Sequence, residues 1–439
     1  MKRTLISDTP QAVGSSVCIF GWVHNRRDHG KLIFLDIRDR TGIVQVVIIP
    51  DRADISAVAK NLRGEFVVIL EGVVKLRPGG TESEKANTGS VEIECAKLTV
   101  IAKPKGDLPL EVNKKEMDIQ LATLLNHRNL TLRNPKVNAI FRLYSVVLEA
   151  YANSMRGDGF MEIKTPKILS SATEGGANLF KLKYFNRFAF LAQSPQFYKQ
   201  AGVGAFERVF EIGTVFRAEP HYTTRHVNEY TSFDAEMGFI ENLEDIMKQF
   251  EHMIQNVFIT VRKRCSGILE EYEQKITAPK IFPRMKLTEA LDILKKNYGK
   301  ELETVDIDPE GERLISEYVK KEYNSDFVFL THYPTNIRPM YTMPSRDPHY
   351  TESFDVIYRG VEIATGGQRI HDYDKLVASM ISHGLNPKEF ESYLSIFRNG
   401  MPPHGGWGLG SERLVQKMLG LKNVREAILF PRDVKRLEP

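Results

Sequence analysis

The chain has 439 residues, of which 42% are hydrophobic and 26% charged. These ordinary globular values exclude a disordered or fibrous protein and predict about three domains, or one large and one small domain. Cys18, Cys95 and Cys265 are widely spaced, so neither a disulfide framework nor a Cys-ligated zinc site is expected. No apolar run reaches about 18 residues and no apolar signal segment opens the chain, so we expect a cytoplasmic protein without a membrane span.

The net charge is +4, and its distribution along the chain is uneven. Residues 1–105 hold 16 Lys and Arg against 12 Asp and Glu, whereas the rest of the chain is balanced. An excess of this size can arise by chance. It also fits an N-terminal unit that binds a polyanion such as a nucleic acid.

Residues 16–105 contain about five short segments rich in Val and Ile, separated by turn signals such as Arg77-Pro78-Gly79-Gly80. This pattern predicts a small closed barrel, for which the OB-fold is the natural candidate. Such barrels often bind single-stranded nucleic acid by stacking bases on aromatic side chains. Phe34, between Ile33 and Leu35, is therefore either a stacking platform or a core residue.

The rest of the chain predicts an α+β domain built on an antiparallel sheet flanked by helices, because strands and helices alternate irregularly after a long amphipathic helix near 136–157. Neither the P-loop motif nor the Rossmann glycine motif occurs. We expect an OB-fold domain over 1–105, a linker or hinge over 106–135, a catalytic domain over 136–439, and a helical insertion at about 265–335.

Three segments carry most of the chemical information. The first, residues 159–168, is a strand that must end at Thr165-Pro166. The second, residues 209–239, is a predicted hairpin in which Arg217 and Glu219 share one sheet face. Such a pair is usually structural, but two arginines and a histidine within ten residues favour phosphate binding, because the arginine fork fits phosphate oxygens.

The third segment, residues 400–420, has four glycines within six residues, followed by Arg413 near the start of a helix. Glycine allows a backbone to approach a ligand closely. Such a stretch can also be a turn that merely tolerates strain, and the Glu-Arg that follows makes this reading the weaker one.

In this order, the three segments resemble the three signatures of class II aminoacyl-tRNA synthetases, and the N-terminal barrel fits the subgroup that charges aspartate, asparagine and lysine. The resemblance covers almost the whole chain. It implies a compact, archaeal-like homodimer in which the long helix and the Pro166 strand form the dimer signature.

The stretches 173–180, 191–200 and 353–373 look like those of aspartyl-tRNA synthetases. Aspartate needs fixed positive charge, which Lys199 and Arg369 supply, whereas an asparagine enzyme of the same class would gain little from both cations. The resemblance implies that Glu174 holds the substrate ammonium and that Lys199 and Arg369 clamp its side chain. The remaining expected aspartate contacts are Gln196, Phe197, Tyr198, Arg217, Asp234 and Thr365.

By resemblance, Arg217 and Arg413 are the catalytic residues for ATP. Arg217 would bind the α-phosphate, Glu219 would read the adenine edge and Phe233 would stack beneath the base. The full expected ATP-binding set is Arg217, Ala218, Glu219, Arg225, His226, Val227, Phe233, Glu362, Gly410, Ser411, Glu412 and Arg413. Mg²⁺ prefers one or two carboxylates with phosphate oxygens and water, and its expected ligands are Asp355, Glu362 and Thr365.

The implied reaction has two steps, ATP-dependent formation of aspartyl-adenylate and transfer of the aspartyl group to the terminal adenosine of tRNA. It needs no side-chain nucleophile, and no Ser-His-Asp or Cys-His arrangement is apparent in the sequence. The rival readings are an asparaginyl enzyme and a non-catalytic tRNA-binding paralogue. The paralogue is disfavoured because the phosphate arginines and the metal carboxylates are all present.

The barrel would read the anticodon. The resemblance favours Phe34 as the stacking residue, Gln45 as a base reader and Arg27 as a further contact. His24, His29 and Pro78 resemble the type that charges both tRNA(Asp) and tRNA(Asn), whose product a downstream amidotransferase would convert. The alternatives are a strictly tRNA(Asp)-specific enzyme and histidines without a role in discrimination.

Overall fold

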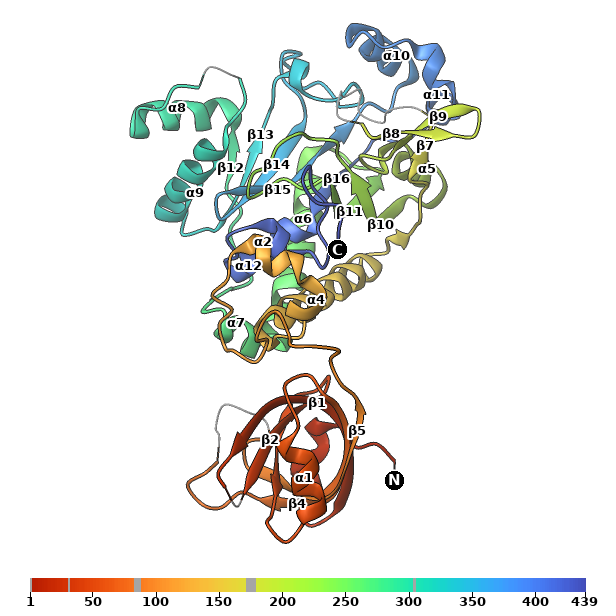
Figure 1. Ribbon diagram of the computed structural model, residues 1–439. Coiled ribbons are helices and arrows are strands. Elements are labelled where there is room, and N and C mark those ends of the chain that lie inside the picture. Colours follow the sequence, from red (N-terminus) through yellow and green to blue (C-terminus); the bar gives the residue numbers. More distant parts are fainter. Residues whose placement is uncertain (1, 31, 83–87, 171–178, 303–304) are drawn as a thin grey trace. The chain divides into compact units, whose positions relative to one another are not determined.

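The computed structural model describes residues 2–30, 32–82, 88–170, 179–302 and 305–439 (Figure 1). Glu174, the expected ammonium partner, lies outside the described residues. Among the residues described, we find no helix that is both long and apolar enough to cross a membrane. The chain divides into two compact units, which are Met1–Asp118 with Arg133–Pro135 and Ile119–Leu132 with Lys136–Pro439.

The first unit is a closed five-stranded barrel with the strand order β1-β2-β3-β5-β4, which confirms the predicted OB-fold (Figure 1). The β3–β5 pair is parallel, and the other neighbouring strands are antiparallel. Its elements are η1 (Ile6–Ala12), β1 (Ser16–Asp28), β2 (Ile33–Arg38), β3 (Ile43–Ile48), α1 (Ala53–Lys60), β4 (Val67–Leu76) and β5 (Val91–Ala102).

Strand β2 shows how alternation places Phe34. Ile33, Leu35 and Ile37 are buried in the barrel core, whereas Phe34 between them is half-exposed. Successive side chains of a strand point to opposite faces, so Phe34 lies on the outside of the barrel. The reading of Phe34 as a core residue is therefore wrong.

The barrel unit is completed by residues that return to it from further along the chain. The Glu65 side chain, 2% exposed, forms ion pairs with Arg38 at 2.9 Å and with Arg133 at 3.0 Å. Asn134 donates through Nδ2 to the backbone carbonyl groups of Val112 and Lys114. Arg133 and Asn134 directly precede the first residue of helix α4 (Pro135–Gly157).

The second unit is built on an eight-stranded sheet (Figure 1). The pairs at its two edges, β12–β13 and β6–β10, are parallel, and all central pairs are antiparallel. The prediction of an α+β domain on an antiparallel sheet is thus confirmed for its centre. In spatial order the strands are β12 (Arg284–Lys286), β13 (Phe327–Thr331), β14 (Ser353–Tyr358), β15 (Val361–Arg369), β16 (His404–Gly410), β11 (Glu229–Gly238), β10 (Arg208–Phe216) and β6 (Met161–Glu162).

Helices and a small second sheet surround this sheet. The second sheet has the order β7 (Ile168–Leu169), β9 (Arg187–Leu191) and β8 (Lys181–Tyr184). Besides α4, the helices are α2 (Leu121–Asn126), α3 (Arg128–Thr131), α5 (Gln196–Phe206), α6 (Leu243–Arg264), α7 (Ser266–Glu271), α8 (Leu287–Tyr298), α9 (Pro309–Tyr323), α10 (Tyr373–Ser382), α11 (Glu391–Arg398) and α12 (Ser411–Leu419), with short 3-10 turns η2 (Thr335–Ile337), η3 (Pro387–Phe390) and η4 (Val424–Ala427).

Helices α4 and α6 and strands β11 and β16 contribute to one hydrophobic core. Helix α6 begins at a capping box, in which Asn242 and Asp245 bond each other's backbone amides, and it ends in three basic residues. On β11, Phe233, Ala235 and Met237 belong to this core, while Ser232 and Asp234 line a cavity. The period-two alternation of the strand thus separates the core from a polar site.

Residues 265–335, predicted as a helical insertion, contain α7, α8 and α9 but also β12 and β13, which extend the main sheet. A separate hydrophobic core holds α8 and α9 against the β12 and β13 end of the sheet. Its buried members include Met285, Leu294, Ile315, Val319 and Leu330.

Candidate active site

The largest group of predicted site residues lines one cavity of about 230 Å³ in the second unit. It is lined by alternate residues of β11 and β16, by residues 362–366 of β15, and by segments near Arg217 and Arg338. The predicted residues among the lining are Gln196, Lys199, Arg217, Glu219, Arg225, His226, Val227, Asp234, Glu362, Thr365, Arg369, Gly410, Glu412 and Arg413.

Lys199, on α5, supplies a fully buried cation to one end of the cavity. Its Nζ donates to Asp234 Oδ1 at 3.0 Å and to the backbone carbonyl of Trp407 at 3.0 Å, and it lies 3.3 Å from Glu236 Oε2. A buried ammonium is tolerated only when it is paired in this way.

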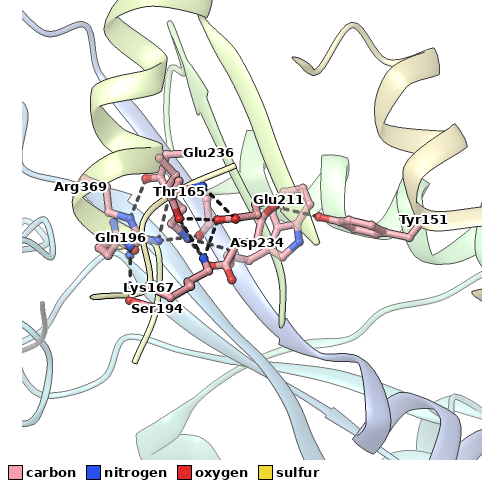
Figure 2. A network of polar contacts seen from close by, with 12 residues as sticks. Tyr151, Thr165, Lys167, Ser194, Gln196, Glu211, Asp234, Glu236 and Arg369 are labelled. Carbon is pink, nitrogen blue, oxygen red and sulfur yellow. Dashed lines mark hydrogen bonds and ion pairs between the residues drawn. The ribbon is translucent and has the colours of Figure 1, made fainter. Parts of the chain in front are cut away.

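Arg369, at the end of β15, is the second buried cation, and Glu236 holds it (Figure 2). Its Nε donates to Glu236 Oε1 at 2.9 Å, and Nη2 donates to the carbonyl of Gly406 at 3.1 Å. The Arg369 guanidinium also lies 5.4 Å from the ring centre of Tyr341. Although burial opposes ionisation, Arg369 and Lys199 together hold the pKa of Glu236 below its usual value.

Glu236 is therefore a residue that the sequence analysis missed. It pairs with Lys199 and Arg369, the two cations expected to hold the aspartate side chain. The signal was available in the sequence, because Asp234 and Glu236 are two residues apart on one predicted strand and must share a face. At Gly406, a Cβ atom would lie 1.9 Å from the Ala235 carbonyl oxygen and 2.5 Å from Glu236 Oε2, so only glycine fits beside this carboxylate.

The other expected aspartate contacts divide into two groups. Gln196 is buried in the cavity wall, and its Nε2 is one of the buried nitrogens without a partner in the described part of the chain. Phe197 instead stacks on Tyr393 at 4.0 Å, and Tyr198 is exposed. The side chains of Phe197 and Tyr198 do not line the cavity, because adjacent residues on α5 point in different directions, and their expected aspartate contacts stay a prediction.

Four arginines at the other end of the cavity each face a carboxylate. The distances are 3.7 Å for Arg217–Glu219, 2.8 Å for Arg225–Glu312, 2.8 Å for Arg338–Asp355 and 4.0 Å for Arg413–Glu362. This concentration of guanidinium groups is suited to a polyphosphate, whose oxygens can replace the carboxylates as partners. His226 lies between Glu219, at 3.5 Å, and Thr223, whose Oγ1 is 2.7 Å from Nδ1.

The carboxyl groups of Asp355 and Glu362 fit a divalent cation. Burial and the nearby Asp355 charge raise the pKa of Glu362 to about 7, so a second positive charge beside this carboxyl group would favour its ionised form. Asp355 Oδ1 is buried and has no hydrogen-bond partner among the described residues. An orphaned carboxylate oxygen beside a second carboxylate offers the hard oxygen ligands that Mg²⁺ prefers.

Arg338 is the second residue that the sequence analysis missed at this site. It follows η2 in a segment without a motif, and it donates through Nη1 to Thr365 Oγ1 at 3.1 Å. Its position between Asp355 and Thr365 results from chain folding over long sequence distances. Glu312, on α9, is a third missed residue, since it also accepts from the Glu362 amide at 2.7 Å.

The expected role of Phe233 is wrong. Its side chain is fully buried and stacks on Tyr151 at 4.2 Å, because its position on β11 faces the helices rather than the cavity. Tyr230, three residues earlier, lines the cavity instead, and the Arg217 guanidinium lies 5.7 Å from its ring centre. Tyr230 is thus the aromatic residue of β11 that faces the cavity.

For the ATP site that the resemblance implies, replacing Tyr230 should weaken nucleotide binding specifically. We expect Tyr230→Ala to raise the KM for ATP about tenfold, because stacking of one base on an aromatic ring contributes about 1–3 kcal/mol. The KM for aspartate should change little. Steady-state pyrophosphate exchange tests this, with Phe233→Leu as the control that lowers stability and leaves the ATP KM unchanged.

The side chains of Ser411 and Glu412 form hydrogen bonds to other parts of the protein. Glu412 accepts from the Tyr144 hydroxyl at 3.0 Å and from the Thr231 amide at 2.9 Å, and Ser411 donates to the Thr231 carbonyl at 2.8 Å. These contacts tie the start of α12, and with it Arg413, to α4 and β11. Of the other expected ATP contacts, Val227 and Gly410 line the cavity, whereas Ala218 does not.

Four of the predicted anticodon residues form one cluster on the barrel. Arg27 lies 5.8 Å from the Phe34 ring centre and donates to Gln45 Oε1 at 3.1 Å and to Asp36 Oδ1 at 2.8 Å. The His29 ring meets Phe34 edge-on at 5.6 Å. An aromatic ring flanked by a cation and an amide is suited to stack a base and read its edge.

His24 and Pro78 lie apart from these contacts. His24 Nδ1 is 3.3 Å from Arg38 Nη1, and the histidine lines a hollow with Glu65 and Leu108. Burial and the Arg38 charge lower the pKa of His24, which favours a neutral ring. Pro78 is exposed in the turn after β4.

Residues 120–434 match the family of class II tRNA synthetases for D, K and N, and residues 17–101 match the OB-fold nucleic acid binding domain. The chain is 43% identical to an aspartate–tRNA(Asp/Asn) ligase of Aeropyrum pernix, over 99% of this chain and 98% of the relative. It is 46% identical to an aspartate–tRNA(Asp) ligase of Pyrococcus abyssi over the full length of both chains.

Among solved structures, asparaginyl-tRNA synthetase from Pyrococcus horikoshii with asparaginyl-adenylate superposes with a TM-score of 0.92 at 34% identity, covering all of both chains. Aspartyl-tRNA synthetase from Entamoeba histolytica gives 0.89 at 30% identity, covering 100% of this chain and 93% of that one.

The barrel, the antiparallel sheet and the cavity thus define a class II tRNA synthetase with an OB-fold domain. Within that class, the chain belongs to the aspartate–tRNA ligase family.

Proposed function

We propose that this protein ligates L-aspartate to tRNA at the expense of ATP. The observation that carries the proposal is the pair of buried cations, Lys199 and Arg369, which face one end of a cavity whose other end holds four arginines. One end suits a carboxylate side chain and the other a triphosphate.

Aspartate fits the cation end better than asparagine. Lysine and arginine only donate hydrogen bonds, and both oxygens of a carboxylate accept them. The amide nitrogen of asparagine would face a donor and stay unpaired, which penalises the wrong substrate. Asp234 is placed to receive the substrate ammonium, since it already accepts from the Lys199 ammonium.

In the first step, an α-carboxylate oxygen of aspartate forms a bond to the α-phosphorus of ATP. The bond from that phosphorus to the bridging oxygen breaks, and pyrophosphate leaves. In the proposed arrangement Arg217 stabilises the charge of the transition state, while Arg225, His226 and Arg413 hold the outer phosphates. Bound Mg²⁺ would neutralise phosphate charge, held by Asp355, Glu362 and Thr365.

In the second step, a hydroxyl of the terminal adenosine of tRNA attacks the carbonyl carbon of the adenylate, and AMP leaves. The anhydride is already activated, so orientation of the two reactants supplies much of the acceleration. No nucleophilic side chain is required.

The proposal extends to both tRNA(Asp) and tRNA(Asn). By resemblance, His24, His29 and Pro78 support relaxed selection, and the relatives include ligases named for tRNA(Asp) alone and for tRNA(Asp/Asn). Charging of purified transcripts with labelled aspartate tests it. Comparable charging of both supports a relaxed enzyme that feeds an amidotransferase, charging of tRNA(Asp) alone supports a strict one, and charging of neither contradicts the proposed function.

We further propose a homodimer that uses α4 and the segment around Pro166. Sedimentation velocity at nanomolar protein concentration tests this proposal. An active monomer under those conditions would contradict it.

The barrel cluster should act on tRNA and not on adenylate formation. We expect Phe34→Ala to raise the KM for tRNA about tenfold, the loss of one base-stacking contact, with unchanged pyrophosphate exchange. Phe20→Ala is the matched control, because Phe20 is also an aromatic residue on the outside of the barrel and has an arginine, Arg3, 5.7 Å from its ring centre. Loss of pyrophosphate exchange in Phe34→Ala would contradict this division of labour.

A further inference from the structure

Arg338 occupies an unusual position for a cation in a site proposed to bind a metal. Its Nη2 lies 2.8 Å from Asp355 Oδ2 and its Nη1 donates to Thr365 Oγ1 at 3.1 Å. Asp355 and Thr365 are two of the three residues proposed above to hold Mg²⁺. The guanidinium therefore lies between the ligands that a divalent cation would use.

The surroundings hold this guanidinium in place. Its Cζ lies 3.7 Å from the ring centre of the buried Tyr333, so the planar group is stacked, and the Arg338 side chain is only 14% exposed. Nε and Nη2 are nevertheless without a well-directed hydrogen bond among the described residues. A stacked guanidinium with donor capacity to spare can exchange one anionic partner for another with little movement.

The charges around Arg338 explain why its exchange of one anionic partner for another would depend on the nucleotide. Each of the four arginines at this end of the cavity faces one carboxylate, which is Glu219, Glu312, Asp355 or Glu362, and the Asp306 charge also acts on Arg338 and Asp355. A divalent cation arriving alone would meet the Arg338 charge within a few ångströms, and like charges this close in a partly buried site repel strongly. A cation arriving with ATP brings phosphate oxygens that can pair with Arg338.

We propose that Arg338 is a positioning residue that occupies the divalent-cation position in the nucleotide-free enzyme and thereby makes metal binding depend on ATP. This inference rests on the proposed function, because that function assigns Asp355 and Thr365 to the metal. When metal and ATP enter together, Arg338 exchanges Asp355 for phosphate oxygens and Asp355 becomes free to bind the metal.

The test is Mn²⁺ binding to the nucleotide-free enzyme, followed by the electron paramagnetic resonance signal of free Mn²⁺. Arg338→Met removes the charge at similar length, and Arg338→Lys keeps it. We expect Arg338→Met to bind Mn²⁺ about tenfold or more tightly than wild type, since a nearby like charge is gone, and Arg338→Lys to bind weakly. Equal affinity of all three, or weaker binding by Arg338→Met, would overturn the proposal.

A second substitution tests whether the tighter Mn²⁺ binding of Arg338→Met takes place at Asp355. Adding Asp355→Asn to Arg338→Met should abolish the gain, and tight binding that persists would place the ion elsewhere and overturn the proposal. Arg338→Gln replaces Arg338→Met should the latter not fold. Aspartate-dependent pyrophosphate exchange by the wild type is measured in parallel, because its absence contradicts the proposed function, whereas the Mn²⁺ comparison judges Arg338 separately.

Discussion

Arg217→Ala should abolish adenylate formation while leaving the protein folded. The Arg217 side chain is 37% exposed in the cavity and its carboxylate partner, Glu219, is 3.7 Å away, so the fold depends little on it. In the proposed reaction the same guanidinium stabilises charge that develops on the α-phosphate. Arginines in this role contribute about 1,000-fold or more to phosphoryl-transfer rates.

The measurement is aspartate-dependent exchange of pyrophosphate into ATP, with the thermal midpoint recorded in parallel. We expect a loss of about 1,000-fold or more in kcat/KM with a nearly unchanged midpoint. Arg313→Ala is the control, because Arg313 on α9 is exposed and pairs with Glu317 outside the cavity. Such exposed pairs contribute little, so its exchange activity should equal that of the wild type. Substantial exchange by Arg217→Ala would contradict the assigned role.

Lys199→Met should remove aspartate binding and destabilise the protein. The substitution leaves Asp234 and Glu236 buried with one cation, Arg369, so the pocket acquires a negative charge that repels aspartate. Truncating one partner of a buried charge pair weakens binding by about 3 kcal/mol. We therefore expect the KM for aspartate to rise about 100-fold or more. The uncompensated carboxylates should lower the free energy of unfolding by about 3 kcal/mol.

Lys167→Met is a matched control for this prediction (Figure 2). Lys167 pairs with the buried Glu211 at 2.9 Å, and Glu211 lies opposite Asp234 in the β10–β11 register. Its loss also leaves a carboxylate without its cation, but neither residue lines the cavity. We expect Lys167→Met to reduce stability without changing the KM for aspartate. An equal rise in that KM for both variants would show that the Lys199 effect is structural.

Alternation in strands made much of the fold and part of the site predictable. The barrel followed from Val- and Ile-rich segments and their turns, and Arg217, Glu219 and Asp234 were singled out inside short motifs. The same alternation, applied along β11, would have found Glu236 and would have placed Phe233 in the core.

Other contacts could not be read from local sequence. Arg338 meets Asp355 and Thr365 from a loop without regular structure, and Glu312 reaches Arg225 across 87 positions of the chain. These pairs depend on which segments the tertiary fold brings together. No spacing rule in the sequence encodes that information, because each partner lies in a different element.

The ion pair between Glu65 and Arg133 has a consequence for how freely the barrel could be exchanged between proteins by recombination. A barrel excised as one continuous piece ending at residue 118 would lack Arg133 and Asn134, and Glu65 would keep Arg38 as its cationic partner. Such a fragment would carry a buried carboxylate with weakened compensation, a costly arrangement. The barrel is therefore a discontinuous module, and grafting it requires the residues that precede α4 as well.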